Sequence, residues 1–348
     1  MTLSYRARKR LRTLGIVALV LFLVFSVVYL CWVLFVDRYV IFTDEGAKLD
    51  FSASVDDLSG GIIATEPAPE EPVSIYYNEG QDVLETEDNL KPLSGYYADS
   101  DALAGSLDDI LSAVNNMSKD CAVMLDMKSI YGNYYYSTGI EDASLSETVS
   151  IDAVGQLISA LHDKEAYTIA RVPAFRDRDY VVKNPSCAIP GKDAEGNASY
   201  PWPADDSCYW MDPANDQTVT MMIRIAHELQ DLGFDEVVFS DFYIPYNDEL
   251  YFDSELSRNE ILEQVAADLI SSCGAPTFAI SFETIDPALV IPEGRSRLYL
   301  AGVDAAEVDD TVQKITVTDP MVNLVFLADT NDTRFDAYSV LRPIANAK

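Results

Sequence analysis

Strand and helix patterns alternate along the chain from residue 91 onward, and this alternation limits the possible folds more than any other feature. Short apolar runs of strand length are separated by stretches with apolar residues at helical spacing, such as SLDDILSAVNNM and MMIRIAHELQDLG. Such alternation is typical of parallel strands joined by helical crossovers. The pattern predicts seven strands, at residues 93–98, 121–127, 166–172, 235–242, 277–283, 297–303 and 321–329.

Seven parallel strands within residues 91–348 favour a TIM-type (β/α) barrel over a doubly wound sheet. No G-x-G-x-x-G sequence follows the first predicted strand, which argues against a dinucleotide-binding fold. We therefore predict an α/β protein whose barrel is shortened to about seven strands, because no eighth apolar run is evident.

A basic segment and a long apolar stretch precede this region. Residues 1–13 contain five Arg and Lys and no acid, and residues 14–36 contain no charged side chain. At about 1.5 Å per residue, a helix of this length crosses the hydrocarbon core of a bilayer. The stretch ends in large side chains, which favours a retained signal-anchor over a cleaved signal peptide. The basic flank predicts a cytoplasmic N-terminus and a single-pass protein of the cell membrane with an extracellular C-terminal domain.

Residues 37–90 are predicted to form an extracellular stalk. This segment contains the proline-acid run TEPAPEEP and the acidic run NEGQDVLETEDN. Proline and repelling like charges favour an extended chain with few core contacts. The domain organisation predicted from the sequence is therefore a cytoplasmic tail, a transmembrane helix, a stalk and a barrel.

The charge balance excludes one class of partner. The chain has 57 Asp and Glu against 24 Lys and Arg, for a net charge of −33 at pH 7. Nucleic acid phosphates require Lys and Arg, so we predict no nucleic acid partner.

The histidines and cysteines limit the chemistry further. Both histidines, His162 and His227, fall inside predicted helices, and no Cys-x-x-Cys pair occurs. This argues against a zinc site and a Ser-His-Asp triad, and we predict neither a metal nor another cofactor. Cys187 and Cys208 flank a loop and could form a disulfide outside the cell.

Carboxylates remain as the acid–base groups. The active site of a barrel lies at the carboxyl ends of its strands, where this sequence places Asp126, Asp241 and Glu283. Pairs of carboxylates cleave glycosidic bonds, one as acid and the other as nucleophile or base. We therefore predict these three as the catalytic residues. Asp304 and Asp329 also follow predicted strands.

Four sequence blocks stand out along the chain: AVMLDMKSIYGNYYY, ISALHDKEAYTIARVPAFRD, YWMDPAND and GFDEVVFSDFYIP. In this order they resemble the blocks of a glycoside-hydrolase-like TIM-barrel family, a bacterial domain of unknown function. The resemblance covers about residues 93–250 and implies a barrel with a sugar-cleaving site. The family positions that this chain matches are Asp126, Lys128, Arg171, Asp177, Trp210 and Asp212.

Three departures from the family pattern fall at strand ends. The chain has Ser240 where the family has an Asp, Tyr243 where it has an Arg, and Ile280 where strand five usually has an Asp. Asp241 can replace the missing Asp only if the strand shifts by one residue, which a bulge beside Ser240 would allow.

Two hypotheses follow. The first is a membrane-anchored extracellular glycoside hydrolase that acts on cell-envelope or environmental polysaccharide, with polysaccharide or cell-wall glycan as its partner. The second is a catalytically inactive barrel that serves as a glycan-binding or envelope scaffold module. Under the first, the predicted substrate-binding residues are Lys128, Arg171, Asp177, Trp202, Trp210, Asp212 and Tyr243.

Overall fold

The computed structural model describes residues 40–43, 46–49, 90–119, 121–199, 201–202, 208–292 and 294–346. The chain divides into two compact units, Met1–Gln81 and Asp82–Lys348. In the first unit, β1 (Val40–Thr43) pairs antiparallel with β2 (Gly46–Leu49). The predicted transmembrane helix and most of the predicted stalk lie outside the described residues. Among the helices that the structure does describe, none is both long and apolar enough to span a bilayer.

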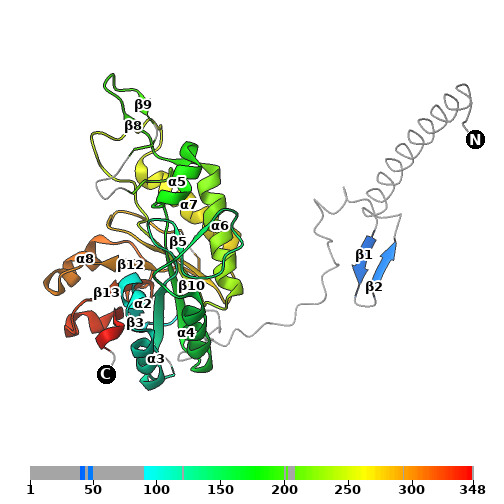
Figure 1. Ribbon diagram of the computed structural model, residues 1–348, viewed down its shortest axis with the longest axis vertical. Helices are drawn as coiled ribbons and strands as arrows, with labels where there is room; N and C mark the ends of the chain where they lie inside the picture. The colour runs from blue at the N-terminus through cyan, green and yellow to red at the C-terminus, as the bar shows by residue number, and fades with distance from the viewer. Residues whose placement is uncertain are drawn as a thin grey trace, which may run out of the picture. The chain divides into compact units, whose positions relative to one another are not determined.

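The second unit is built on a closed barrel of eight parallel strands (Figure 1). Around the barrel the strand order is β10-β11-β12-β13-β14-β3-β4-β7. The strands are β3 (Ser94–Ala98), β4 (Ala122–Asp126), β7 (Tyr167–Pro173), β10 (Glu236–Ser240), β11 (Ala279–Glu283), β12 (Leu298–Ala301), β13 (Leu324–Leu327) and β14 (Ser339–Pro343). The first seven correspond to the seven strands predicted from the sequence.

The prediction of a barrel shortened to seven strands is wrong. β14 pairs with β13 on one side and with β3 on the other, and so completes the closed barrel. Its sequence SVLRP contains only two large aliphatic residues and ends in a proline. Such a short run gives no clear period-2 or buried-strand pattern, which is why the sequence alone did not indicate it.

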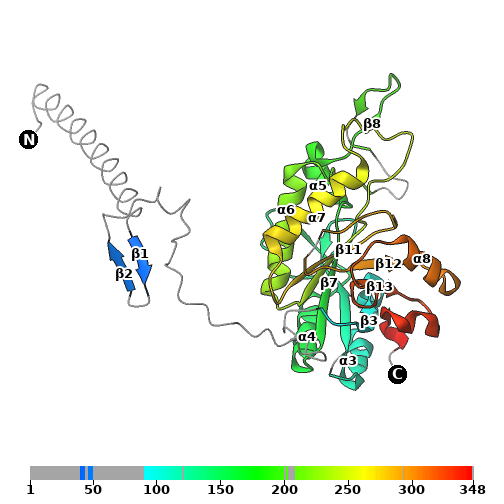
Figure 2. The same cartoon turned by 180° about the vertical axis from the view of Figure 1, so that it is seen from behind.

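Helices cover the outside of the barrel. In both views α6 and α7 lie side by side, as do α3 and α4 (Figures 1 and 2). The helices are α2 (Ser100–Ala104), α3 (Leu107–Asn116), α4 (Ile151–Asp163), α5 (Arg178–Lys183), α6 (Asp216–Asp231), α7 (Arg258–Cys273), α8 (Val308–Lys314) and α9 (Pro320–Asn323). Short 3-10 helices are η2 (Pro185–Cys187), η3 (Ala305–Glu307), η4 (Thr333–Ala337) and η5 (Ile344–Asn346).

Side-chain caps fix where the long helices start. Asn215 accepts a hydrogen bond from Gln217 N at 2.9 Å and begins α6. Ser257 and Glu260 form a reciprocal capping box that begins α7. Because α6 follows β7 and α7 follows β10 along the chain, both helices start at the end of the barrel where the strands finish.

The connections on this side of the barrel carry two small sheets. β5 (Asn133–Tyr134) pairs with β6 (Ser144–Leu145) between β4 and α4. The hairpin of β8 (Gly191–Lys192) and β9 (Ala198–Ser199) belongs to the long connection between β7 and α6. These insertions enlarge the loops around the carboxyl ends of the strands.

A buried polar cluster occupies the opposite end of the barrel. Glu236, the first residue of β10, forms an ion pair with Arg297, and both side chains are fully buried. The hydroxyls of Tyr299 and Tyr167 each donate to Glu236 at 3.0 Å. Because every charged group in this cluster has a partner, the amino ends of the strands are closed by structure rather than by an open site.

Candidate functional site

The carboxyl ends of β4, β7 and β11 bring three charged side chains into contact. Arg171 donates from Nη1 to Asp126 Oδ1 at 3.1 Å. It also donates from Nε and Nη2 to the two oxygens of Glu283, at 2.6 and 2.9 Å. The two hydrogen bonds to Glu283 form a bidentate pair, the strongest arrangement for a guanidinium and a carboxylate. We call Asp126, Arg171 and Glu283 the carboxylate–arginine triad.

The second oxygen of Asp126 is also held. The backbone N–H of Ser100, at the start of α2, donates to Asp126 Oδ2 at 2.9 Å. Burial raises the pKa of Asp126, while Arg171 and the Ser100 N–H oppose that rise. Both oxygens are therefore fixed in place by donors that favour the ionised form.

Arg171 is a permanent cation in this arrangement. Burial lowers its pKa, but the neighbouring carboxylates of Glu283 and Asp126 raise it more, and the net direction is upward. The guanidinium thus stays charged and places a fixed positive charge between two carboxylates.

Asp241 reaches the same region by a backbone turn. β10 ends at Ser240, and Asp241 then adopts a left-handed conformation with φ of 52°. No bulge is needed, because this turn redirects the chain directly after the strand. Arg176 Nη1 lies 3.4 Å from Asp241 Oδ1. Burial raises the pKa of Asp241, with Glu283 acting in the same direction and Arg176 and Arg171 in the other.

A cavity of about 400 Å³ opens at this end of the barrel, and we call it the mouth pocket. Its volume falls in the range of ordinary small-molecule sites. Asp126, Arg171 and Asp241 line it, whereas Glu283 does not. Two carboxylates from different strands therefore face one cavity, with Arg171 between Asp126 and Glu283.

Lys128 and Asp177 form a second ion pair beside the mouth pocket. Lys128 Nζ lies 2.7 Å from Asp177 Oδ2, and both side chains are almost completely buried. Asp177 also caps α5 by accepting from Tyr180 N at 2.8 Å. Lys128 lines the mouth pocket, but its charge is already paired, so the pair holds the loop after β4 against α5.

The predicted aromatic residues lie in packed positions. Trp202 and Trp210 are 7% and 4% exposed, and neither lines the mouth pocket. Trp210 packs on Tyr243 with ring centroids 4.9 Å apart and lies 5.5 Å from the Arg176 guanidinium carbon. These rings support the arginine that faces Asp241 and offer no open face to a sugar in the mouth pocket.

Three other predicted acids have local structural contacts. Asp212 accepts from Ala214 N at 2.9 Å, and burial raises its pKa. Asp304 caps η3, and Asp329 accepts from the Tyr97 hydroxyl at 2.6 Å. None of the three lines the mouth pocket.

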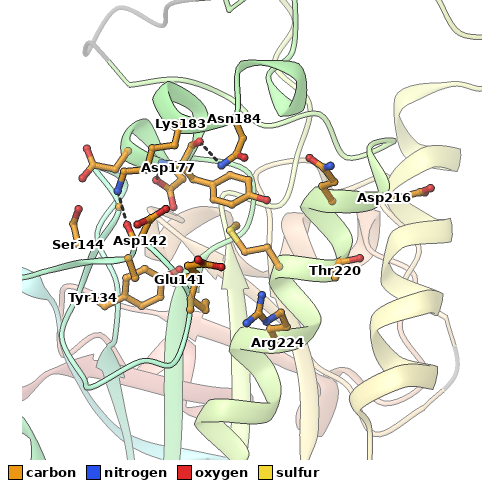
Figure 3. A pocket seen from close by; sticks show the side chains of 17 residues that line it. Tyr134, Glu141, Asp142, Ser144, Asp177, Lys183, Asn184, Asp216, Thr220 and Arg224 are labelled. Carbon is orange, nitrogen blue, oxygen red and sulfur yellow. Dashed lines mark hydrogen bonds between the residues drawn. The ribbon is translucent and has the colours of Figure 1, made fainter. Parts of the chain in front are cut away.

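Figure 3 shows a second cavity, of about 430 Å³, between α5, α6 and the 132–144 segment. Asp177, Lys183 and Arg224 are among its labelled lining residues. Alternate residues of the segment around β5 face the two cavities: Asn133 and Tyr135 line the mouth pocket, while Gly132 and Tyr134 line the second one. One extended segment thus separates the two cavities.

Cys187 and Cys208 are not joined in a disulfide in this structure. The Sγ of Cys187 contacts Gln217 Oε1 at 3.0 Å, and the Sγ of Cys208 contacts Ile130 O at 2.9 Å. In the part of the chain that the structure describes, no group of three His, Cys, Asp or Glu side chains is placed to hold a metal ion.

Arg176 is a site residue that the sequence did not indicate. It lies in the loop after β7, where no periodicity fixes the direction of a side chain. Arg176 is part of the sequence RVPAFRD, but that sequence does not indicate its partner. The left-handed turn at Asp241 brings the carboxylate to it. Ser100 was missed for a related reason, because it contributes a backbone N–H rather than its side chain.

Comparison with known families places residues 94–272 under a family model described as "Putative glycosyl hydrolase domain". This range includes Asp126, Arg171 and Asp241 and ends before Glu283. None of the curated proteins matches the chain.

Solved structures also resemble the chain. A hypothetical protein from Ruminiclostridium thermocellum has 22% identity and a TM-score of 0.45, over 53% of this chain and 96% of that one. The α-galactosidase from Lactobacillus brevis has 13% identity and a TM-score of 0.49, over 74% of this chain and 38% of that one. An exo β-N-acetylglucosaminidase from Vibrio harveyi has 7% identity and a TM-score of 0.49, over 73% and 50%. This chain thus spans half or less of the length of these two enzymes.

Proposed function

Since the chain belongs to the glycosyl hydrolase domain family matched over residues 94–272, we propose that it hydrolyses glycosidic bonds of a polysaccharide in the mouth pocket. The observation that carries this proposal is the pair of partly buried carboxylates, Asp126 at the end of β4 and Asp241 directly after β10, that line one cavity. Glycoside hydrolysis requires one carboxyl group that gives a proton and another that acts as a charged partner.

Asp241 is the proton donor in this proposal. A general acid must hold its proton near neutral pH, and burial raises the pKa of Asp241 in that direction. Its ion pair with Arg176 is long, at 3.4 Å. Asp241 would transfer its proton to the glycosidic oxygen as the bond from that oxygen to the anomeric carbon breaks.

Asp126 is the charged partner. Burial raises the pKa of Asp126 as well, so this assignment rests on its contacts: Arg171 and the Ser100 N–H each donate to one of its oxygens, which orients the carboxylate and opposes that rise. Asp126 would either attack the anomeric carbon or take a proton from an attacking water, and the anomeric configuration of the product distinguishes these routes. Glu283 keeps Arg171 in place through its bidentate pair and does not itself reach the substrate.

We further propose that the barrel is held outside the cell by residues 14–36 and acts on cell-envelope or environmental polysaccharide. The support is the uncharged apolar stretch and the basic residues before it. Protease added to intact cells should degrade the barrel domain and leave the N-terminal segment protected. Protection of the whole chain until the cells are lysed would contradict this location.

A second candidate function is glycan binding without cleavage. The observation that favours it is that the three carboxylates proposed from the sequence all have an arginine partner, Arg171 for Asp126 and Glu283 and Arg176 for Asp241. Paired carboxylates accept hydrogen bonds from sugar hydroxyls without needing to transfer a proton.

The test is release of reducing ends from a panel of polysaccharides by the full-length chain. Asp126→Asn and Asp241→Asn should each lower the rate at least about 100-fold, the ordinary contribution of a general acid or base. Asp304→Asn is the matched control, because this strand-end aspartate caps η3 and Asn is an equally good cap. Binding of a polysaccharide with no release by the wild-type chain would favour the second candidate function.

A further inference from the structure

Tyr246 is an exposed aromatic residue in the loop that follows β10. It leaves 77% of its surface exposed, although a tyrosine ring is largely apolar and usually gains from burial. The neighbouring aromatic residues of the site, Trp210 and Tyr243, are by contrast wholly or partly buried. An exposed ring at this position is available to a ligand.

The ring of Tyr246 is held on one side by Arg258. The guanidinium carbon of Arg258 lies 4.3 Å from the centroid of the Tyr246 ring and 4.4 Å from that of Phe252. Such distances correspond to cation–π contacts with both rings. Arg258 makes no ion pair with any described residue, so the rings rather than a carboxylate hold its charge.

The loop that carries Tyr246 is anchored to the β8–β9 hairpin. Lys192 N donates to Glu249 O at 2.7 Å, and Lys192 Nζ donates to Asp248 O at 2.9 Å. Tyr251 N donates to Pro190 O at 2.9 Å. These bonds fix the loop from its middle onward, so an incoming ligand meets a surface that is already ordered.

A cavity of about 490 Å³ adjoins the ring. Its lining offers hydrogen-bonding groups beside an apolar surface. The lining residues are Lys192, Tyr246, Asn247, Asp248, Phe252 and Arg258, with Leu250. Flat aromatic faces combined with amide, carboxylate and cationic groups suit a sugar ring, which has C–H groups on its faces and hydroxyls at its edge.

This surface lies close to the mouth pocket along the chain. Tyr246 is five residues after Asp241, and five residues span at most roughly 17 Å. The β8–β9 hairpin that anchors the loop extends beyond α5 in both views (Figures 1 and 2). A glycan with one residue in the mouth pocket could therefore reach the ring with a later residue.

We infer that Tyr246 is a stacking platform for one sugar ring of a glycan chain whose other residues occupy the mouth pocket, so that the substrate is a polymer. This inference rests on the proposed function, because it takes the mouth pocket as the site of cleavage. Arg258 orients the platform. Asn247 and Asp248 form hydrogen bonds with the sugar hydroxyls, in which the Asp248 carboxylate is the acceptor.

The experiment is calorimetric titration of the full-length chain with cellohexaose and chitohexaose, and with the disaccharides cellobiose and chitobiose. Tyr246→Ala should weaken binding of the hexasaccharide about threefold to tenfold, the loss expected for one ring-stacking contact. Tyr246→Phe should retain the wild-type affinity because it keeps the ring. Disaccharide affinity should not change, since a disaccharide occupies the mouth pocket alone.

Met321→Ala is the matched control, because it removes another exposed apolar side chain, 57% exposed, from α9. Equal hexasaccharide affinity in the wild type and in Tyr246→Ala would overturn the platform, as would a wild-type chain that binds none of the four probes. Binding that depends on Tyr246 but yields no reducing ends from any polysaccharide would instead overturn the proposed function and leave the platform in place.

Discussion

Asp241 is the residue at which the backbone of the site departs from regular structure. A left-handed conformation costs most L-residues on the order of 1 kcal/mol, and Asp and Asn tolerate it better than most others. The structure therefore places a tolerant residue at the one turn that directs a carboxylate into the mouth pocket. Arg176 and the Trp210 ring behind it then hold that carboxylate from the adjacent loop.

The pH dependence of cleavage should report this contact. Arg176 lowers the pKa of Asp241 against the larger rise caused by burial. If protonated Asp241 is the general acid, activity falls as the pH rises through its pKa. Arg176→Met removes the influence that lowers the pKa, so the alkaline limb of kcat/KM should move to higher pH.

The measurement is the pH profile of kcat/KM for reducing-end release. Arg334→Met removes an arginine on η4, outside the mouth pocket, and should leave the profile unchanged. An alkaline limb that stays in place or moves to lower pH in Arg176→Met would rule out Asp241 as the acid.

At the scale of elements, the barrel depends on a close approach between β3 and β4. Gly95 lies opposite Ala122, and a Cβ built on Gly95 would lie 1.8 Å from Ala122 O. That separation is far below any van der Waals contact, so the two strands can pair in this way only with glycine at the position. β3 also pairs with β14, so displacing it would disturb both neighbours.

Gly95→Ala should therefore lower the free energy of unfolding by more than about 2 kcal/mol, because the added methyl group forces the strands apart. The measurement is urea unfolding followed by circular dichroism. Gly155→Ala is the matched control: Gly155 lies inside α4 with nothing within 4 Å of a new Cβ. It should raise stability by about 0.5–1 kcal/mol. Similar effects of the two substitutions would refute this account of Gly95.

The elements also show how far the sequence could predict this structure. Apolar runs such as AVMLD in β4 identify strands because buried parallel strands need such residues on both faces. The position of Asp126 at the end of its strand followed from that. The contact between Arg176 and Asp241 did not, since a single φ angle decides where Asp241 points. Hydrophobic periodicity contains no information about such a turn.

The tryptophans illustrate the same limit. Trp202 and Trp210 lie in the long β7–α6 connection, where composition alone suggests exposed rings. The loop instead folds on itself through backbone bonds such as Ile189 N to Trp210 O, at 2.8 Å, and buries both rings. Contacts within a loop depend on its three-dimensional path, which neither propensity nor spacing determines.

At the largest scale that the structure defines, the barrel has two chemically different ends. Glu236 and Arg297 close the amino end of the barrel with fully buried, paired charges. At the carboxyl end, Asp126 and Asp241 border an open cavity and their pKa values are raised by burial. In barrels of this type the active site lies at the carboxyl ends of the strands, which is the end where this open cavity is found.

Loss of barrel closure should affect the whole molecule at once. A chain truncated after residue 338 lacks β14 and leaves the edges of β13 and β3 unpaired. We expect it to lose the cooperative thermal transition seen by calorimetry and to aggregate through these edges. Truncation after residue 346 serves as the control. A cooperative transition in the shorter chain would mean that the remaining seven strands fold without closure.

The place of β14 in the chain also affects how the protein is made. β3 is the first barrel strand to be synthesised, and β14, which must pair with it, is the last. During translation, more than 240 residues must therefore emerge after the start of β3 before its partner β14 is available. Early folding cannot extend beyond an open sheet. Until β14 is released, the unpaired edges of that open sheet can pair with other chains.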